Sequence, residues 1–341
     1  MPEEHRVSWP DNERFLADYL NDDDFFTALS TSNGFLSKKF GNANGYDAFS
    51  GRAADVAQTV FDGGVASLEQ GLDDGADRWF LHLHFLEPHV PYDPPEDYLD
   101  ALEGLEPVPW DLSNKAAHYE AVGAWESLSE DQADNLLAHL AVRYEGEIRW
   151  LDDQLEGFFA DMEQRGWLED TLVAVWSDHG EQFYERGHAS HGWNLHQEEN
   201  TGLFFMASEG LVPGASTAPS TSIDIVPTLM QGLGLAAPVA DVDGLALGLG
   251  TGDRPRFALA DAKAGLVQMV ERDNKQLFYN WNGSARLYNL AVDPQQQDDL
   301  FDPTHPDVQA LWPLLVERTE RIQPLAPQYT AVAPPGLSLT R

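Results

Sequence analysis

The sequence contains no cysteine and little positive charge. With no cysteine among 341 residues, the chain forms no disulfide and carries out no thiol chemistry. Cysteine usage therefore gives no information on whether the protein works in an oxidising or a reducing compartment. Lysine and arginine total 20 against 57 aspartates and glutamates, which gives a formal net charge of −37. Because phosphate backbones are bound by clustered lysines and arginines, nucleic acid is excluded as a general partner.

This charge balance favours a protein adapted to concentrated salt. A carboxylate-coated surface stays hydrated, and dissolved salt screens the repulsion between its charges. The alternative interpretation is simply an acidic surface in ordinary salt. A hydrophobic content of 43% with 10 tryptophans indicates a folded globular protein in either case.

Long apolar runs are also lacking. The N-terminal stretch MPEEHRVSWPDNERF has neither a basic nor an apolar segment and is not a signal peptide. The longest apolar window, IVPTLMQGLGLAAPVA, is interrupted by proline and glycine and is too short to cross a bilayer. We therefore expect no membrane span and, as the sequence stands, a soluble protein in the cytoplasm. Export stays open if a signal peptide precedes Met1.

Apolar segments of strand length alternate with segments of helical periodicity. The pattern predicts strands at residues 25–31, 78–86, 171–177 and 202–208, and helices at 12–20, 52–72, 129–166 and 222–235. The third helix opens with a capping box at Ser129 and Gln132, and its apolar residues, among them Leu137 and Ile148, are expected to form one buried stripe. Apolar strands alternating with helices predict an α/β fold with a covered, mostly parallel sheet.

Glycine-rich sequence near residue 250 predicts a boundary. We expect an α/β domain over residues 1–250 and a smaller C-terminal subdomain over 251–341 packed on it. Within the subdomain, QLFYNWNGSARLYNLAVDP predicts an antiparallel hairpin that turns at Asn282–Ser284, and residues 305–322 predict a terminal helix. The tryptophan-containing insertion at residues 100–128 has no pattern that assigns it.

Polar residues that bind metals cluster behind the strand at 171–177. Asp178 and His179 follow it directly, in WSDHGEQFYERGHASHG, and ligands collect at such strand ends in α/β sheets. Aspartate oxygen and histidine nitrogen both bind divalent cations. Alternatively, Asp178 caps a following helix and His179 is an ordinary loop histidine. His188 and His191 are suited to bind an anionic ester or donate a proton, and His89 lies on a proline-rich loop at another strand end.

Taken in order, these segments resemble the sulfatase family of the alkaline-phosphatase-like superfamily. The resemblance is carried by FLHLHFLEPHVPYDPP, YEGEIRWLDDQL and TLVAVWSDHGEQFYERGHASHGWNLHQEE, with SIDIVPTLMQGLGL and RLYNLAVDP downstream. It implies an α/β/α sandwich with a small C-terminal antiparallel sheet. It also implies hydrolysis of a small-molecule or glycan sulfate ester at one divalent metal.

The resemblance assigns roles to individual residues. Asp178 and His179 match two metal ligands, with calcium the usual ion of the family. Many relatives have asparagine where this chain has His179, so manganese, magnesium and zinc stay open. His89 matches the histidine that faces the sulfuryl group, and His191 lies where relatives supply a donor to the leaving group. Asn33 lies near the position of an active-site lysine, and His188 is assigned to substrate binding.

Part of the family pattern is missing from the sequence. The family's nucleophile lies in a Cys/Ser-x-Pro-x-Arg segment after a first strand that ends in acidic ligands, and this sequence contains neither. Nucleophilic catalysis needs a positioned nucleophile. The expectation is therefore a fragment that lacks the family's opening segment. The alternatives are a phosphodiesterase or phosphonate-ester hydrolase of the same superfamily, or a non-catalytic relative that binds an anionic ligand or a protein partner.

Overall fold

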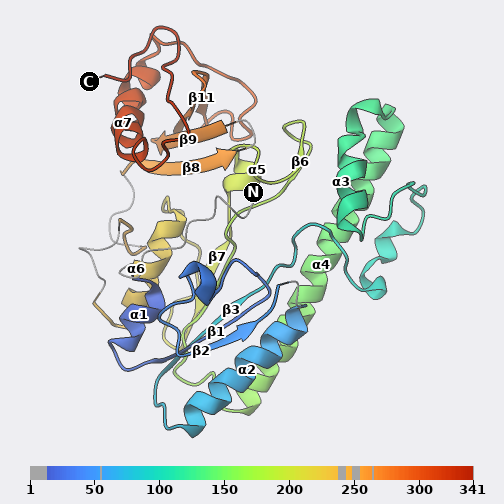
Figure 1. Ribbon diagram of the computed structural model, residues 1–341, viewed down its shortest axis with the longest axis vertical. Coiled ribbons are helices and arrows are strands. Elements are labelled where there is room, and N and C mark those ends of the chain that lie inside the picture. The colour runs from blue at the N-terminus through green and yellow to red at the C-terminus, as the bar shows by residue number, and fades with distance from the viewer. Residues whose placement is uncertain (1–13, 54–55, 237–242, 248–253, 263–264, 341) are drawn as a thin grey trace. The chain divides into compact units, whose positions relative to one another are not determined.

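A computed structural model of the chain describes residues 14–53, 56–236, 243–247, 254–262 and 265–340 (Figure 1). It forms two compact units, residues 1–169 and 170–341. The predicted boundary at residue 250 lies outside the described residues and stays a prediction. Within the described residues, no helix has the length and apolar character needed to cross a membrane.

The first unit is built on a parallel sheet of three strands. β1 (Phe26–Thr31) pairs with β2 (Ala48–Gly51) on one side and with β3 (Trp79–His84) on the other. This confirms the predicted strands at 25–31 and 78–86. In the described part of the chain, β3 pairs on one side only and leaves its second edge open.

Helices cover this sheet and extend beyond it. α1 (Leu16–Asn21) and α2 (Ala57–Asp73) match the helices predicted at 12–20 and 52–72, although the beginning of the first prediction lies outside the described residues. α2 lies along the strands, with α4 (Glu130–Gln164) beside it (Figure 1). The insertion at residues 100–128, which had no predicted structure, contains α3 (Lys115–Gly123) and single 3-10 turns at Asp100–Leu102 and Trp125–Ser127, and a further 3-10 turn at Glu96–Tyr98 precedes it.

The long helix α4 begins as predicted, and its buried face departs from the predicted stripe at Ile148. The Ser129 hydroxyl accepts from the Gln132 amide, and the Gln132 side chain accepts from the Ser129 amide at 3.0 Å, which confirms the capping box. The predicted stripe is partly wrong, because Leu136 is buried and Ile148 is 44% exposed. A row of residues spaced strictly by three and four drifts slowly around a helix of 3.6 residues per turn. Over the 35 residues of α4 such a row does not stay on the buried side throughout.

Glycines allow α2 to approach the sheet closely. A Cβ at Gly71 would overlap the ring of Phe26, the first residue of β1, whereas a Cβ at Gly157 of α4 meets nothing within 4 Å. We expect Gly71→Ala to destabilise the chain by about 1–3 kcal/mol through overpacking. Gly157→Ala is the matched control and should stabilise it by about 0.5–1 kcal/mol, because alanine favours the helix. Urea unfolding of both variants checks this, and equal effects of the two changes would contradict it.

The second unit contains three small sheets. β4 (Val173–Trp176) pairs antiparallel with β7 (Phe204–Ala207), and β5 (Gln182–Phe183) pairs with β6 (Ala189–Ser190) between them in sequence. The strands predicted at 171–177 and 202–208 are thus present. Within the described residues β4 also pairs on one side only. α5 (Gln197–Asn200) precedes β7, and a 3-10 turn (Ser222–Asp224) leads into α6 (Ile225–Gly232), within the predicted helix at 222–235.

The C-terminal part is an antiparallel sheet with one helix against it. β8 (Arg256–Ala262), β9 (Gly265–Arg272), β10 (Lys275–Asn280) and β11 (Ala285–Asn289) pair in sequence order, and the predicted hairpin turns at residues 281–284. α7 (Pro306–Ile322) is the predicted terminal helix. It buries Val308, Leu311, Trp312, Leu315 and Val316 against one sheet face. The opposite face carries Met269, Phe278 and Tyr288, which pack with Leu195 of the preceding loop.

Candidate functional site

Asp178 and His179 emerge from the end of β4 into an irregular segment. The strand closes through a hydrogen bond from the Ser177 amide to Leu203 O at 3.1 Å. The Asp178 carboxylate then accepts from the His179 amide at 2.9 Å. No helix begins here, because β5 and β6 come next in the described chain. The alternative interpretation of Asp178 as a helix cap is therefore wrong.

The two side chains lie close enough to share one cation. His179 Nε2 is 3.7 Å from Asp178 Oδ2, and both side chains are open to solvent. His179 Nδ1 lies 2.8 Å from the carbonyl oxygen of Gly180. A carbonyl only accepts, so Nδ1 carries the proton and the lone pair is on Nε2, the atom nearer Asp178. This is the tautomer that a metal ligand needs.

His191 is brought to the same place by the β5–β6 hairpin. Its ring centroid lies 4.1 Å from that of His179. Its Nδ1 lies 3.1 Å from Oε1 of Glu181, whose side chain is nearly buried. The hydrogen bond to Glu181 raises the pKa of His191 above its ordinary value. The carboxylate of Glu181 thus stabilises the protonated form of His191, and this suits a proton donor.

A buried glutamate that the sequence did not single out holds this loop. Glu199 of α5 is 5% exposed. Its carboxylate accepts from the backbone amides of Gly192 at 2.6 Å and Trp193 at 2.9 Å, and from the side-chain amide of Gln182. Its own carbonyl accepts from the Gly180 amide at 2.8 Å. Glu199 thus fixes the backbone on both sides of the His179–His191 pair.

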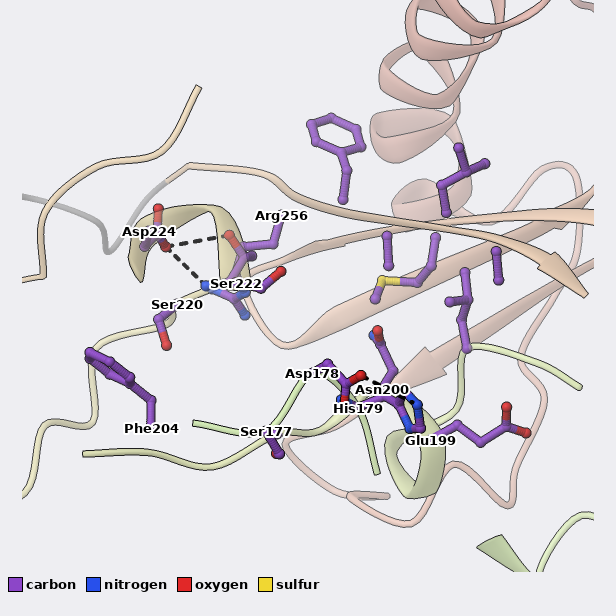
Figure 2. A pocket seen from close by; sticks show the side chains of 18 of the residues that line it. Ser177, Asp178, His179, Glu199, Asn200, Phe204, Ser220, Ser222, Asp224 and Arg256 are labelled. Carbon is purple, nitrogen blue, oxygen red and sulfur yellow. Dashed lines mark hydrogen bonds and ion pairs between the residues drawn. The ribbon is translucent and has the colours of Figure 1, made fainter. Parts of the chain in front are cut away.

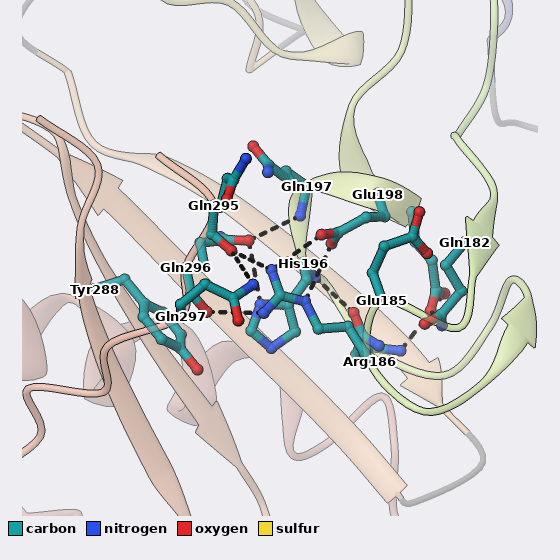
Figure 3. A network of polar contacts seen from close by, with 12 residues as sticks. Gln182, Glu185, Arg186, His196, Gln197, Glu198, Tyr288, Gln295, Gln296 and Gln297 are labelled. Atoms are coloured by element: carbon teal, nitrogen blue, oxygen red, sulfur yellow. Dashed lines mark hydrogen bonds and ion pairs between the residues drawn. The ribbon is translucent and has the colours of Figure 1, made fainter. Parts of the chain in front are cut away.

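A second polar network ties the same segment to the turn after β11 (Figure 3). Gln296 Oε1 accepts from the Gln197 amide at 3.0 Å and lies 3.2 Å from His196 Nδ1. Arg186 donates to Gln296 O at 2.8 Å and pairs with Glu198 at 3.0 Å. Burial lowers the pKa of His196 to about 4, so His196 is neutral at pH 7 and acts as a packed histidine. The network supports the loop that carries His191.

His188 lies on the same hairpin but faces differently. Its ring stacks on Trp193, with centroids 3.9 Å apart and planes at 7°. The residues that line the cavity near Asp178 include His191 and not His188. The assignment of His188 to substrate binding stays a prediction.

A cavity of about 520 Å³ opens beside Asp178, His179 and His191. Figure 2 shows Asp178, His179 and Glu199 on one side of it and Ser220, Ser222 and Asp224 on the other. Strands β8 and β9 contribute an apolar wall. A cavity with a few convergent polar groups and an apolar wall is the usual form of a small-molecule site.

The two remaining predicted residues belong to the first unit. Asn33 follows β1, and its side-chain oxygen accepts from the Phe35 amide at 2.9 Å, which closes a local turn. His89 lies on the loop after β3, and its Nδ1 is 2.8 Å from Val90 O. As in His179, this contact requires a proton on Nδ1 and leaves the lone pair on Nε2. Their predicted roles stay predictions.

The side chains of Asp178 and His179 are chemically suited to bind a divalent cation, but two ligands are a small number for a metal site. In the described ranges, no group of three or more histidine, aspartate or glutamate side chains is arranged to hold a metal. Protein metal sites ordinarily use at least three protein ligands. These two residues alone are therefore too few to hold a metal, and their predicted role as metal ligands stays a prediction.

The incomplete ligand set gives a measurable prediction. With two ligands, about 0.1 mM calcium, magnesium, manganese or zinc should stabilise the isolated chain by less than about 0.5 kcal/mol, because stabilisation follows the occupancy of the folded state. Thermal unfolding with and without metal checks this, with Asp178→Asn as the matched control. A rise of several degrees that Asp178→Asn abolishes would show that the chain holds a complete site.

Comparison with known proteins identifies a matching family and several relatives of this chain. The family model described as Sulfatase matches residues 7–235. A choline-sulfatase of Rhizobium meliloti is 24% identical over 245 residues, which cover 67% of this chain and 48% of the relative. An arylsulfatase of Clostridium perfringens is 24% identical over 243 residues, 67% of this chain and 50% of the relative. The chain thus spans about half the length of the curated relatives it matches.

Solved structures show the same fold. BT4656 in complex with its substrate D-glucosamine-2-N,6-O-disulfate superposes with a TM-score of 0.71 at 12% identity, covering 93% of this chain and 84% of that one. A phosphonate monoester hydrolase from Silicibacter pomeroyi gives a TM-score of 0.64 at 18% identity, covering 92% and 81%. The predicted α/β fold, with its C-terminal antiparallel sheet and terminal helix, is confirmed.

Proposed function

Because this chain belongs to the sulfatase family, we propose that it acts in the hydrolysis of sulfate esters at one divalent metal ion. The observation that carries the proposal is the Asp178–His179 pair beside His191 at the mouth of a cavity. Calcium is the first candidate for the ion. When bound, the ion would draw negative charge from the sulfate oxygens and so ease attack on sulfur.

The residues of this chain have separate tasks in the proposal. Asp178 and the Nε2 atom of His179 hold the metal. His191, whose protonated form is stabilised by Glu181, gives a proton to the ester oxygen as the leaving group departs. His89 and Asn33 bind the sulfuryl group, and His188 contributes to substrate binding. Glu199 acts through the loop backbone and keeps His191 in position.

The nucleophile has to come from elsewhere. The sequence has no cysteine and no Ser-x-Pro-x-Arg or Thr-x-Pro-x-Arg segment. β3 and β4 each have one edge with no strand beside it in the described ranges, and an open edge accepts a further strand. We therefore propose that a segment outside these 341 residues supplies a strand, the nucleophile and the remaining metal ligands.

A direct experiment compares the chain alone with the product of its genomic locus, including the DNA upstream of Met1. We expect release of 4-nitrophenol from 4-nitrophenyl sulfate by the longer product only. The activity should disappear on chelation and fall at least about 100-fold in Asp178→Asn, because an open metal site loses a ligand. Activity that persists with chelator and in Asp178→Asn would contradict the proposal. An inactive longer product that still binds sulfate esters would favour the non-catalytic alternative.

The phosphonate monoester hydrolase among the solved structures supports a second candidate. Its likeness at 18% identity is one of fold, and fold alone does not select the ester. The same assay with 4-nitrophenyl phenylphosphonate separates the two functions. A higher kcat/KM for the phosphonate than for the sulfate would assign the site to phosphoryl chemistry.

A further inference from the structure

The cavity beside Asp178 offers little positive charge to a ligand. Arg256 is the single lysine or arginine among the described residues that line it. Its guanidinium pairs with Glu271. Glu271 also accepts from the Gln276 side chain at 2.9 Å, so the pair is fixed within the sheet. Arg256 is therefore committed to a partner inside the protein.

Carboxylates outnumber this one arginine around the cavity. Asp178, Glu199 and Asp224 line the cavity. The Asp224 carboxylate pairs with Arg254, and that of Glu199 is bound to loop amides. Asp178 remains open to solvent. With the net charge of −37 on the whole chain, the cavity lies in a field that repels anions.

The rest of the wall suits an uncharged group. Ala258 and Ala260 of β8 and Met269 of β9 line it, and they pack on one face of the sheet. Ser220 and Ser222 also line the cavity (Figure 2). Apolar carbons and hydroxyls contact a neutral ring or chain without needing a counter-ion.

We infer that this cavity accepts sulfate monoesters whose organic part carries no further negative charge, and that it disfavours disulfated and polysulfated ligands. The inference rests on the proposed function, because one sulfate is assumed to be held at the metal. A second sulfate would then lie in the cavity near carboxylates, where Arg256 is paired with Glu271 and His191 with Glu181. At a separation of about 7 Å in a partly hydrated site, such a repulsion weakens binding roughly tenfold.

The test uses two ligands that differ by one charge, N-acetylglucosamine 6-O-sulfate and D-glucosamine-2-N,6-O-disulfate. Calorimetry gives Kd for the longer product of the genomic locus with each ligand, with calcium at the same concentration throughout, at about 0.1 M and about 2 M NaCl. The monosulfate should bind roughly tenfold more tightly at low salt. The difference should shrink at high salt, because exposed charges are screened there.

Two variants locate the effect. Ala260→Lys places a cation on the cavity wall, because Ala260 lines the cavity on the same sheet face as Met269, and it should abolish the preference for the monosulfate. Val292→Lys adds the same charge at a side chain that is 78% exposed and is not part of the cavity lining. It should leave the preference within about twofold of the starting value, since a distant exposed charge is screened.

The outcomes separate the inference from the proposed function. Equal or tighter binding of the disulfate, or no binding of the monosulfate, overturns the inference. Equal effects of the two lysine variants overturn it as well. Sulfate release from either ligand is measured in the same samples and reports on the proposed function alone. A preference for the monosulfate without any hydrolysis supports the inference and counts against the function.

Discussion

Replacing Glu147 with glutamine is expected to stabilise the chain at alkaline pH by about 4 kcal/mol and to change little near pH 5. Glu147 lies on α4 and is 5% exposed. One carboxyl oxygen accepts from the Asp93 amide at 2.7 Å, and the other has no hydrogen-bond partner among the described atoms. Burial raises the pKa of Glu147 from 4.5 to about 8, and the nearby Glu87 and Asp93 add to the rise.

The sign of the pH dependence follows from that rise. A carboxyl whose pKa is higher in the folded state binds its proton more tightly there, so its contribution to stability is complete below about pH 4.5. The contribution falls as the pH rises through the window from 4.5 to about 8. Glutamine keeps the hydrogen bond from Asp93 and has no charge to bury. The stability of the variant should therefore not fall across this window on account of position 147.

Urea unfolding between about pH 5 and pH 9 measures the difference between variant and parent. Glu145→Gln is the control, because Glu145 is exposed on the same turn of α4. Parallel curves for the parent and Glu147→Gln would contradict the prediction. The hydrogen bond from the Asp93 amide favours the ionised form of Glu147, so the expected loss of stability comes from burial of the charge.

Replacing Glu199 with alanine should cost on the order of 3–5 kcal/mol of stability. The change leaves the amides of Gly192 and Trp193, and the buried side-chain amide of Gln182, without their acceptor. Each unsatisfied buried donor costs about 1–3 kcal/mol, partly recovered where water enters. The loop that carries His191 should become mobile before the rest of the unit unfolds.

Amide hydrogen exchange checks this directly. The amides of Gly192 and Trp193 should exchange at least about 100-fold faster in Glu199→Ala, in line with the loss of their acceptor. Gln197→Ala is the control, since the exposed Gln197 side chain lies on the same helix. Protected amides in Glu199→Ala would show that the carboxylate does not hold the loop.

Local sequence patterns predicted the secondary structure well because their physical causes are local. The Ser129–Gln132 capping box and the turn at residues 281–284 are satisfied by neighbours in sequence. The buried face of α4 was predicted less well, since Ile148 is exposed and Glu147 beside it is buried. Which side of a long helix faces the core depends on segments far away, here the loop after β3.

The candidate site also contains residues that the sequence predicted and residues that it did not. Asp178 and His179 were found because they follow a recognisable strand. Glu199 and Gln296 carry no such signal, because a glutamate in a run of polar residues is most often solvated. Their importance comes from contacts with backbone amides of other segments. A capping residue or a turn glycine can be recognised from its neighbours in the sequence. A side chain that accepts hydrogen bonds from the backbone of another segment cannot.

The open edges of β3 and β4 have a consequence for handling the protein. An unpaired edge is a template for any extended chain, including another copy of the same molecule. The charge of −37 keeps copies apart in dilute buffer, where their mutual repulsion reaches farthest. Concentrated salt removes that protection while leaving backbone pairing intact. The chain on its own should thus stay monodisperse in low salt and self-associate through its sheet edges as salt is raised, which reverses the behaviour usual for strongly acidic proteins.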